Sequence, residues 1–202
     1  MVNVLKNQDF QACFKGTSAL GVRDLVQLGF PRWQVLYAAK TGRLQRLARG
    51  LYGLPEAEPS EYHALAVVSR KAPHAAVCLL SALSFHQLTT TMPHEVWIAV
   101  KKNTRKPSIV YPRVRVAIFA PKSFELGLET HQLEGVPVKV YSAARTVVDL
   151  FRYRNKIGLD VALEALREGY QERRFTLAAV EAIASRLRMS KVMRPYLQSL
   201  VA

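Results

Sequence analysis

A basic segment near the N-terminus carries the side chains best suited to bind a polyanion. Residues 42–54, GRLQRLARGLYGL, hold Arg43, Arg46 and Arg49 together with a turn glycine and a tyrosine. Arginine binds phosphate through charge-assisted, bidentate hydrogen bonds. Two interpretations are open at this point. The segment is either an ordinary polar hairpin or a wing, a basic β-ribbon that lies against DNA while the preceding helix reads the groove.

The helix predicted at residues 31–41, PRWQVLYAAKT, has two dissimilar faces. Its period directs one set of side chains to the core: Val35, Leu36 and Ala39. It directs a second set outward: Trp33, Gln34, Tyr37, Lys40 and Thr41. On DNA, the outward Gln34 can read an adenine edge, Lys40 can meet a guanine or a phosphate, and the aromatic rings can contact thymine methyls or sugars. The alternative is that Trp33 and Tyr37 fold back onto the hairpin or onto a second domain.

The order of elements favours the wing. Helical patterns at residues 4–14 and 21–28 precede the helix at 31–41, and glycines at 29 and 42 are expected to end the last two. Ala48, Arg49 and Gly50 form the predicted hairpin tip, where Gly50 can take the positive φ of a tight turn. Leu44 and Leu47 are three residues apart, so we expect a β-bulge between them. Three helices and a hairpin in this order predict a winged helix-turn-helix domain over residues 1–55.

Charge and composition place a boundary after this domain. The chain of 202 residues has 29 basic and 15 acidic side chains, a net charge of +14. Residues 1–55 hold eight basic and two acidic side chains, which makes them about twice as positive per residue as the remainder. The segment LPEAEPSE at 54–61 is rich in proline and glutamate and is predicted to be a linker. The second domain is therefore predicted to span residues 56–202.

The second domain is predicted to be α+β, with a small sheet followed by a C-terminal helical bundle. A helix is expected at 60–71, a buried strand or strand-to-helix junction at 76–83, and strands at 95–102, 114–120 and 136–142. Four helical patterns follow from residue 142 onward. Three hydroxyl side chains are candidate N-caps of these helices: Ser142, Thr176 and Ser190.

Two features of the second domain have both a structural and a functional interpretation. Residues 101–122 carry seven basic side chains and no acidic one. They are predicted to be a solvated strand–loop–strand, although they could also extend a DNA footprint or dock an acidic protein. Arg145 and Asp149 are one helical turn apart, and the favoured interpretation is a structural ion pair that holds the helix to the sheet.

No pattern in the sequence predicts catalysis. The five histidines lack metal-ligand spacing, Ser81 near His86 lacks a GxSxG context, and no phosphate-binding glycine loop occurs. Metal-dependent nucleases of the restriction type need a carboxylate two residues before a lysine, and no such tripeptide is present. The sequence therefore predicts no enzyme, no catalytic or metal site and no cofactor.

Cellular context is predicted from the cysteines and from the apolar runs. Cys13 and Cys78 are far apart in apolar surroundings, which favours buried thiols in a reducing compartment. Residues 1–10 lack the apolar core of a signal peptide, and the run from residue 75 is too short to span a bilayer. We expect a cytoplasmic protein without a membrane partner.

Three motifs resemble the AbiEi-type antitoxins of type IV (abortive-infection) toxin–antitoxin systems. They are DLVQLGFPRWQVLYAAKTGRLQRLARGLYGLP at 24–55, LLSALSFHQLTTTMPHEVWIAV at 79–100 and VKVYSAARTVVDLFRYRNKIGLDVALEALRE at 138–168. The resemblance covers nearly the whole chain. It implies a bacterial phage-defence protein whose N-terminal winged domain binds inverted repeats in double-stranded DNA of its own promoter as an autorepressor. It also implies a C-terminal domain that neutralises a cognate AbiEii-like nucleotidyltransferase toxin.

The resemblance and the pattern of residues agree on the DNA-binding candidates. These lie on the outer face of the third helix and on the wing: Arg32, Trp33, Gln34, Tyr37, Lys40, Arg43, Arg46 and Arg49. Two other hypotheses stay open. One is a plain winged-helix transcriptional regulator whose second domain senses a ligand, and the other is a DNA-processing enzyme.

Overall fold

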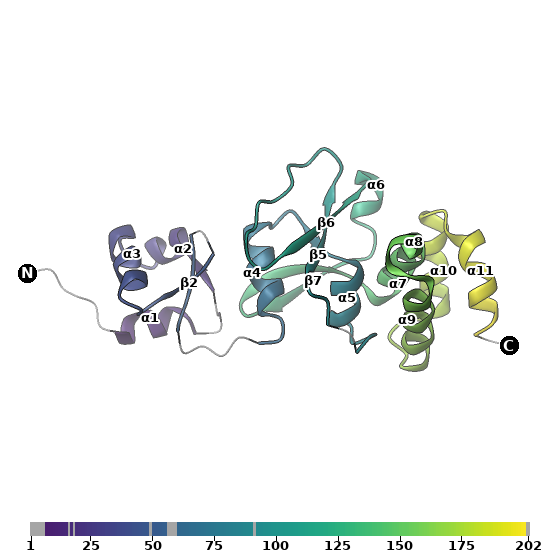
Figure 1. The fold of residues 1–202 in the computed structure, drawn as a ribbon, viewed down its shortest axis with the longest axis horizontal. Helices are drawn as coiled ribbons and strands as arrows, with labels where there is room; N and C mark the ends of the chain where they lie inside the picture. Colours follow the sequence, from purple (N-terminus) through teal and green to yellow (C-terminus); the bar gives the residue numbers. More distant parts are fainter. Residues whose placement is uncertain are drawn as a thin grey trace, which may run out of the picture.

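The computed structural model describes residues 7–15, 17, 19–48, 50–55, 60–90 and 92–200. Within these residues the chain forms eleven helices and two β-sheets, which confirms the predicted α+β class. Figure 1 shows an N-terminal group of helices with a small sheet, then a larger sheet, then a group of helices at the C-terminal end. We refer to residues 7–55 as the N-terminal unit and to residues 60–200 as the C-terminal unit. The predicted domain boundary falls next to residues 56–59, outside the described part of the chain.

The N-terminal unit contains three helices and a three-stranded sheet. The helices are α1 (Asn7–Cys13), α2 (Val22–Gln27) and α3 (Arg32–Lys40). The strands are β1 (Leu20–Gly21), β2 (Gln45–Ala48) and β3 (Leu51–Gly53), in the order β1-β3-β2. Gly29 and Gly42 have φ values of +97° and +75° just beyond α2 and α3, so both predicted helix stops are confirmed. Strand β1 was not predicted, because two residues are too few to show a period.

The hairpin of β2 and β3 is irregular. Its antiparallel register shifts between Arg46 and Ala48, which confirms the predicted bulge. Gly50 has a φ of +72°, as the tight turn requires. Arg49, the predicted tip residue, lies outside the described residues.

An aromatic and aliphatic core holds the N-terminal unit together. The rings of Phe10 in α1 and Phe30 before α3 stack with their centroids 4.5 Å apart. Leu25, Val35 and Leu44 are buried against them. Each helix thus contributes to one core, and this core fixes the direction in which α3 presents its outer face.

The C-terminal unit is built on a five-stranded mixed sheet. The strands are β4 (Ala76–Val77), β5 (Val96–Lys101), β6 (Val114–Phe119), β7 (Leu128–Leu133) and β8 (Val136–Tyr141). Their order is β6-β5-β4-β8-β7, with β5–β6 and β4–β8 parallel. Strand β7 was not predicted, because its half-exposed sequence LETHQL alternates only weakly.

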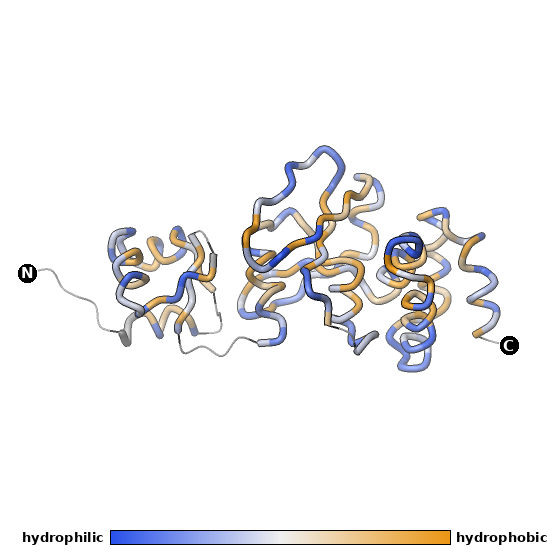
Figure 2. The backbone as a smooth tube through the Cα atoms, in the orientation of Figure 1, coloured by the Kyte–Doolittle hydropathy of each residue, from blue (hydrophilic) through white to orange (hydrophobic). Residues whose placement is uncertain are grey.

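Helices cover both faces of this sheet. Helix α4 (His63–Lys71) packs on the face that carries Val77, Ile98 and Val138. Helices α5 (Leu79–Phe85) and α7 (Ala143–Arg152) share the second core cluster with Trp97 and Phe119. Helix α6 (Pro121–Phe124) follows β6. In Figure 2 the central strands are largely coloured as hydrophobic, as expected for strands buried on both faces.

The C-terminal helices pack around α7. They are α8 (Arg154–Ile157), α9 (Leu159–Gln171), α10 (Leu177–Arg186) and α11 (Ser190–Gln198). Ser142 and Thr176 cap α7 and α10, accepting hydrogen bonds from the backbone N–H of Arg145 (3.3 Å) and Ala179 (3.2 Å). The predicted cap at Ser190 is wrong, because the buried Met189 occupies the N-cap position and Ser190 is already helical.

Arg145 and Asp149 form a fully buried ion pair within α7. Arg145 Nε donates to Asp149 Oδ2 at 2.7 Å, and Arg145 Nη1 donates to the carbonyl oxygens of Ser123 (2.8 Å) and Leu126 (3.0 Å). The guanidinium also lies 4.8 Å from the centroid of the Tyr141 ring. Burial raises the pKa of Asp149 to about 6, against the lowering effect of Arg145. The predicted structural ion pair is thus present, but its hydrogen bonds fasten α7 to α6 and the residue shortly after it, and only the contact with the Tyr141 ring reaches the sheet.

Among the described residues, the two units touch through a small apolar patch and an ion pair. Ala19 and Leu51 of the N-terminal unit pack against Val67 of α4. Arg70 of α4 forms an ion pair with Asp24 of α2. The Asp24 carboxylate also accepts a hydrogen bond from the backbone N–H of Gly21 at 2.8 Å, so it both caps α2 and meets the second unit.

The beginning of the C-terminal unit is anchored by Glu134. Its Oε1 accepts hydrogen bonds from Ser60 N (3.1 Å) and Ser60 Oγ (2.7 Å), and its Oε2 lies 2.9 Å from His63 Nδ1. Glu134 sits in the turn between β7 and β8, so the chain entering α4 is fixed to the sheet. Among the described residues, no helix has both the length and the apolarity needed to cross a membrane.

Candidate nucleic-acid interface

The outer face of α3 is a mixed aromatic and basic surface. Trp33 and Tyr37 are 56% and 53% exposed, and Arg32 and Lys40 are exposed beside them. This exposure argues against the alternative that the two rings pack onto the hairpin or the C-terminal unit. Exposing two aromatic side chains to water costs free energy that contact with a partner would recover. This face is therefore a candidate for contact with a partner.

Two residues of α3 lie on the opposite side from the one predicted. Gln34 is buried, with 7% of its surface exposed, whereas Leu36 is 48% exposed. The prediction set the direction of the helix by the apolarity of Leu36. At about 100° per residue, however, Gln34 lies only about 40° from Ala38 and on the same side as Val35, whereas Leu36 falls between Arg32 and Lys40. Packing of Phe30 and Val35 in the core sets which side of α3 faces inward. Gln34 lies on this inward side and not on the outer face.

Replacing Gln34 is now expected to affect folding more than recognition. Gln34→Ala should lower the free energy of unfolding by about 1 kcal/mol, because it empties part of a packed site. The ratio of affinities for promoter and scrambled duplexes should not change. Chemical denaturation and fluorescence anisotropy measure the two quantities. If Gln34→Ala lowers the ratio of affinities for promoter and scrambled duplexes while the free energy of unfolding stays the same, Gln34 contacts DNA directly.

The basic side chains beside α3 have no acidic partner among the residues that the structure describes. Arg46 in β2 is exposed, and Arg43 in the turn before it is half-buried. Within the described part of the chain, none of these cations forms an ion pair: Arg32, Lys40, Arg43 and Arg46. Their charges are therefore available to an external anion.

The basic segment at 101–122 is a strand–loop–strand, as predicted. It consists of the end of β5, a loop, β6 and the first two residues of α6, and it is largely exposed. Val110 and Tyr111 in this loop are among the most exposed large apolar residues described. Lys101 pairs with Glu125, and the Arg115 guanidinium lies 4.7 Å from the Trp97 ring centroid. Part of the charge in this segment is thus already used within the C-terminal unit.

The serine and histidine considered for catalysis make separate structural contacts. Ser81 Oγ accepts the backbone N–H of Trp97 at 2.9 Å and donates to the Glu95 carbonyl. The His86 ring lies 2.7 Å from the Tyr141 carbonyl oxygen, and burial lowers its pKa. The described residues contain no group of three or more potential metal ligands. Cys78 is buried in the core, where burial raises its thiol pKa, and Cys13 is half-buried.

The chain matches no protein-family model, and no curated protein matches it.

Proposed function

We propose that the N-terminal unit is a winged helix-turn-helix that binds double-stranded DNA. In this proposal α3 is the recognition helix and the β2–β3 hairpin is the wing. The observation that carries the proposal is the outer face of α3, where Trp33 and Tyr37 are exposed beside Arg32 and Lys40, with Arg46 on the adjoining hairpin. Cations position such a domain on phosphates, and a helix face of this kind fits the major groove.

More particularly, we propose an antitoxin of the AbiEi type. The three motifs at 24–55, 79–100 and 138–168 support it, and they extend over both units. In this role the N-terminal unit represses the protein's own promoter, and the C-terminal unit neutralises a nucleotidyltransferase-like toxin encoded beside it. The basic excess of the chain suits the first activity.

A growth-rescue assay tests the antitoxin role separately from DNA binding. The adjacent gene is induced alone, with the wild-type chain, or with a variant in which Lys40, Arg43 and Arg46 are all glutamine. We expect the wild type and the variant to restore growth equally, because neutralisation is assigned to the C-terminal unit. A reporter under the native promoter should be repressed by the wild type only.

One outcome contradicts the antitoxin role, and another contradicts the assignment of the DNA-binding surface. A harmless neighbouring gene, or toxicity that neither chain relieves, removes the antitoxin role and leaves the DNA-binding role intact. If the wild type and the triple glutamine variant repress the reporter equally, the wing and α3 are not the DNA-binding surface.

A ligand-responsive repressor is the second candidate. The observation that favours it is a cleft between the two units, lined by side chains from both.

A further inference from the structure

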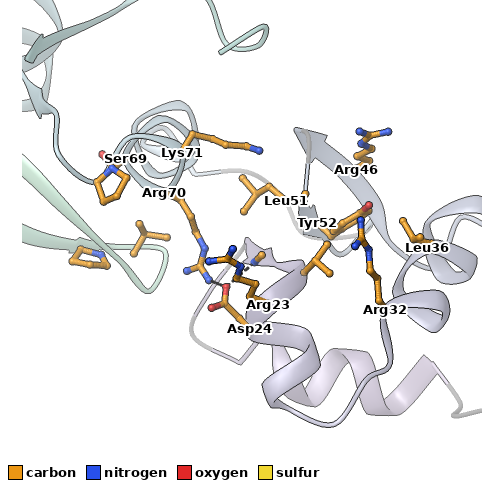
Figure 3. A pocket seen from close by; sticks show the side chains of 16 residues that line it. Arg23, Asp24, Arg32, Leu36, Arg46, Leu51, Tyr52, Ser69, Arg70 and Lys71 are labelled. Atoms are coloured by element: carbon orange, nitrogen blue, oxygen red, sulfur yellow. Dashed lines mark hydrogen bonds and ion pairs between the residues drawn. The ribbon is translucent and has the colours of Figure 1, made fainter. Parts of the chain in front are cut away.

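The cleft between the units has a volume of about 940 Å³. It is lined by residues of α2, α3 and the β2–β3 hairpin on one side and by the C-terminal end of α4 on the other (Figure 3). This volume is in the range of sites that bind small molecules. Its walls are partly apolar, with Val22, Leu36 and Leu51 among the lining residues.

The charges that line the cleft are strongly unbalanced. Five cationic side chains reach it: Arg23, Arg32, Arg46, Arg70 and Lys71. Asp24 is the one acidic lining residue among those described, and it is already bound by the Gly21 N–H and by Arg70. Arg23, Arg32 and Arg46 form no ion pair or hydrogen bond with any described side chain. A concave surface focuses the potential of such charges.

The arginines fall into two groups around the cleft. Figure 3 shows Arg23 and Arg70 gathered at Asp24, while Arg32 and Arg46 lie to the other side, near Tyr52. The first group joins the two units, because Arg23 belongs to α2 and Arg70 to α4. Arg70 is held in place by Asp24, and its partial burial lowers its pKa. A guanidinium held in this way loses little conformational freedom when it binds a second oxygen anion.

We propose that this cleft is a phosphate-binding site in which Arg23 and Arg70 contact the phosphate oxygens and so tie α2 to α4. Each guanidinium can donate a pair of parallel N–H hydrogen bonds to phosphate oxygens, so two arginines can hold one phosphate from two sides. Arg32 and Arg46 add to the positive potential without needing to touch the group. The phosphate belongs either to a free phosphorylated molecule or to a DNA backbone that crosses the cleft. The second source rests on the proposed function, and the first does not.

Binding measurements on the full chain distinguish the two sources. Inorganic pyrophosphate serves as the free probe in calorimetry at constant ionic strength, and a promoter duplex serves as the DNA probe in anisotropy. The variants are Arg23→Gln, Arg70→Gln and, as a control of equal charge change, Arg186→Gln on the exposed surface of α10. Arg23→Gln leaves the Arg70–Asp24 ion pair in place, so it probes the anion contact without altering the contact between units.

We expect the wild type and the control to bind pyrophosphate with equal affinity. Arg23→Gln and Arg70→Gln should each lower this affinity at least tenfold. This result identifies a free phosphorylated molecule as the ligand. Absence of pyrophosphate binding, together with a tenfold loss of DNA affinity in Arg23→Gln and a salt slope lower by about one, identifies the DNA backbone. Unchanged binding of both probes in Arg23→Gln overturns the site. A wild type that binds pyrophosphate but not DNA refutes the proposed function and leaves this site standing.

Discussion

Replacing Asp149 with alanine is expected to lower the free energy of unfolding by about 3–5 kcal/mol. The substitution leaves the guanidinium of Arg145 fully buried without its carboxylate. The carbonyl oxygens of Ser123 and Leu126 continue to accept its hydrogen bonds, but they neutralise no charge. Chemical denaturation followed by circular dichroism measures the change.

Two further variants show whether the charge causes this loss. Glu181→Ala, at an exposed position of α10, should alter stability by less than about 0.5 kcal/mol. The double variant Arg145→Met/Asp149→Leu removes both charges and should be far less destabilised than Asp149→Ala, because desolvation of an ion pair offsets much of its attraction. If Asp149→Ala unfolds within 1 kcal/mol of the wild type, the pair does not hold α7 to its neighbours.

Removing three cations from the N-terminal unit is expected to reduce DNA affinity on the order of 100-fold at 0.1 M salt. The variant is Lys40→Gln/Arg43→Gln/Arg46→Gln, whose residues lie at the end of α3, in the following turn and in β2. Each phosphate contact contributes about 0.9 to the slope of log affinity against log salt, so the slope should fall by ~2.7. Fluorescence anisotropy of a promoter duplex between 50 and 300 mM salt gives both quantities.

The matched control removes equal charge from the opposite end of the molecule. Arg186→Gln/Lys191→Gln/Arg194→Gln alters exposed side chains of α10 and α11 and lowers the net charge by the same amount. It should change the slope by less than about 0.5, because it reduces only the long-range attraction. Equal slopes in the two variants would mean that net charge, and no particular face, binds DNA.

The sequence predicted most elements of the fold, because their periods are strong and their ends are marked. The helix at 31–41 is found as α3, with Gly42 beyond its end, and the bulge in the hairpin is present. The rotation of α3 was not predictable in the same way. The apolar and polar residues of RWQVLYAAK do not separate into two clean faces, and contact with Phe30 and Leu25 decides which side is buried.

Contacts between distant segments left no local signal in the sequence. Asp24 and Arg70 are 46 residues apart, and Glu134 meets Ser60 across 74. Each is an ordinary charged or polar residue in its own stretch, so the cleft and the anchor of α4 emerge only once the chain is folded. The pairing of β7 with β8 is likewise not visible in the sequence of β7 alone. The regular alternation of buried and exposed residues in β8 sets the register of β7, whose own alternation is weak.

The anchoring of Ser60 by Glu134 makes the connection between the units a short tether. The fixed part of the C-terminal unit begins at Ser60, and the hairpin of the N-terminal unit ends at Gly53. From Gly53 to Ser60 the covalent chain can span roughly 25 Å, at about 3.5 Å per residue. A connection of this length gives each unit an effective concentration around the other in the millimolar range or above. Association of the units is thus a unimolecular equilibrium that dilution cannot shift, and the units stay covalently joined when the Arg70–Asp24 ion pair is lost.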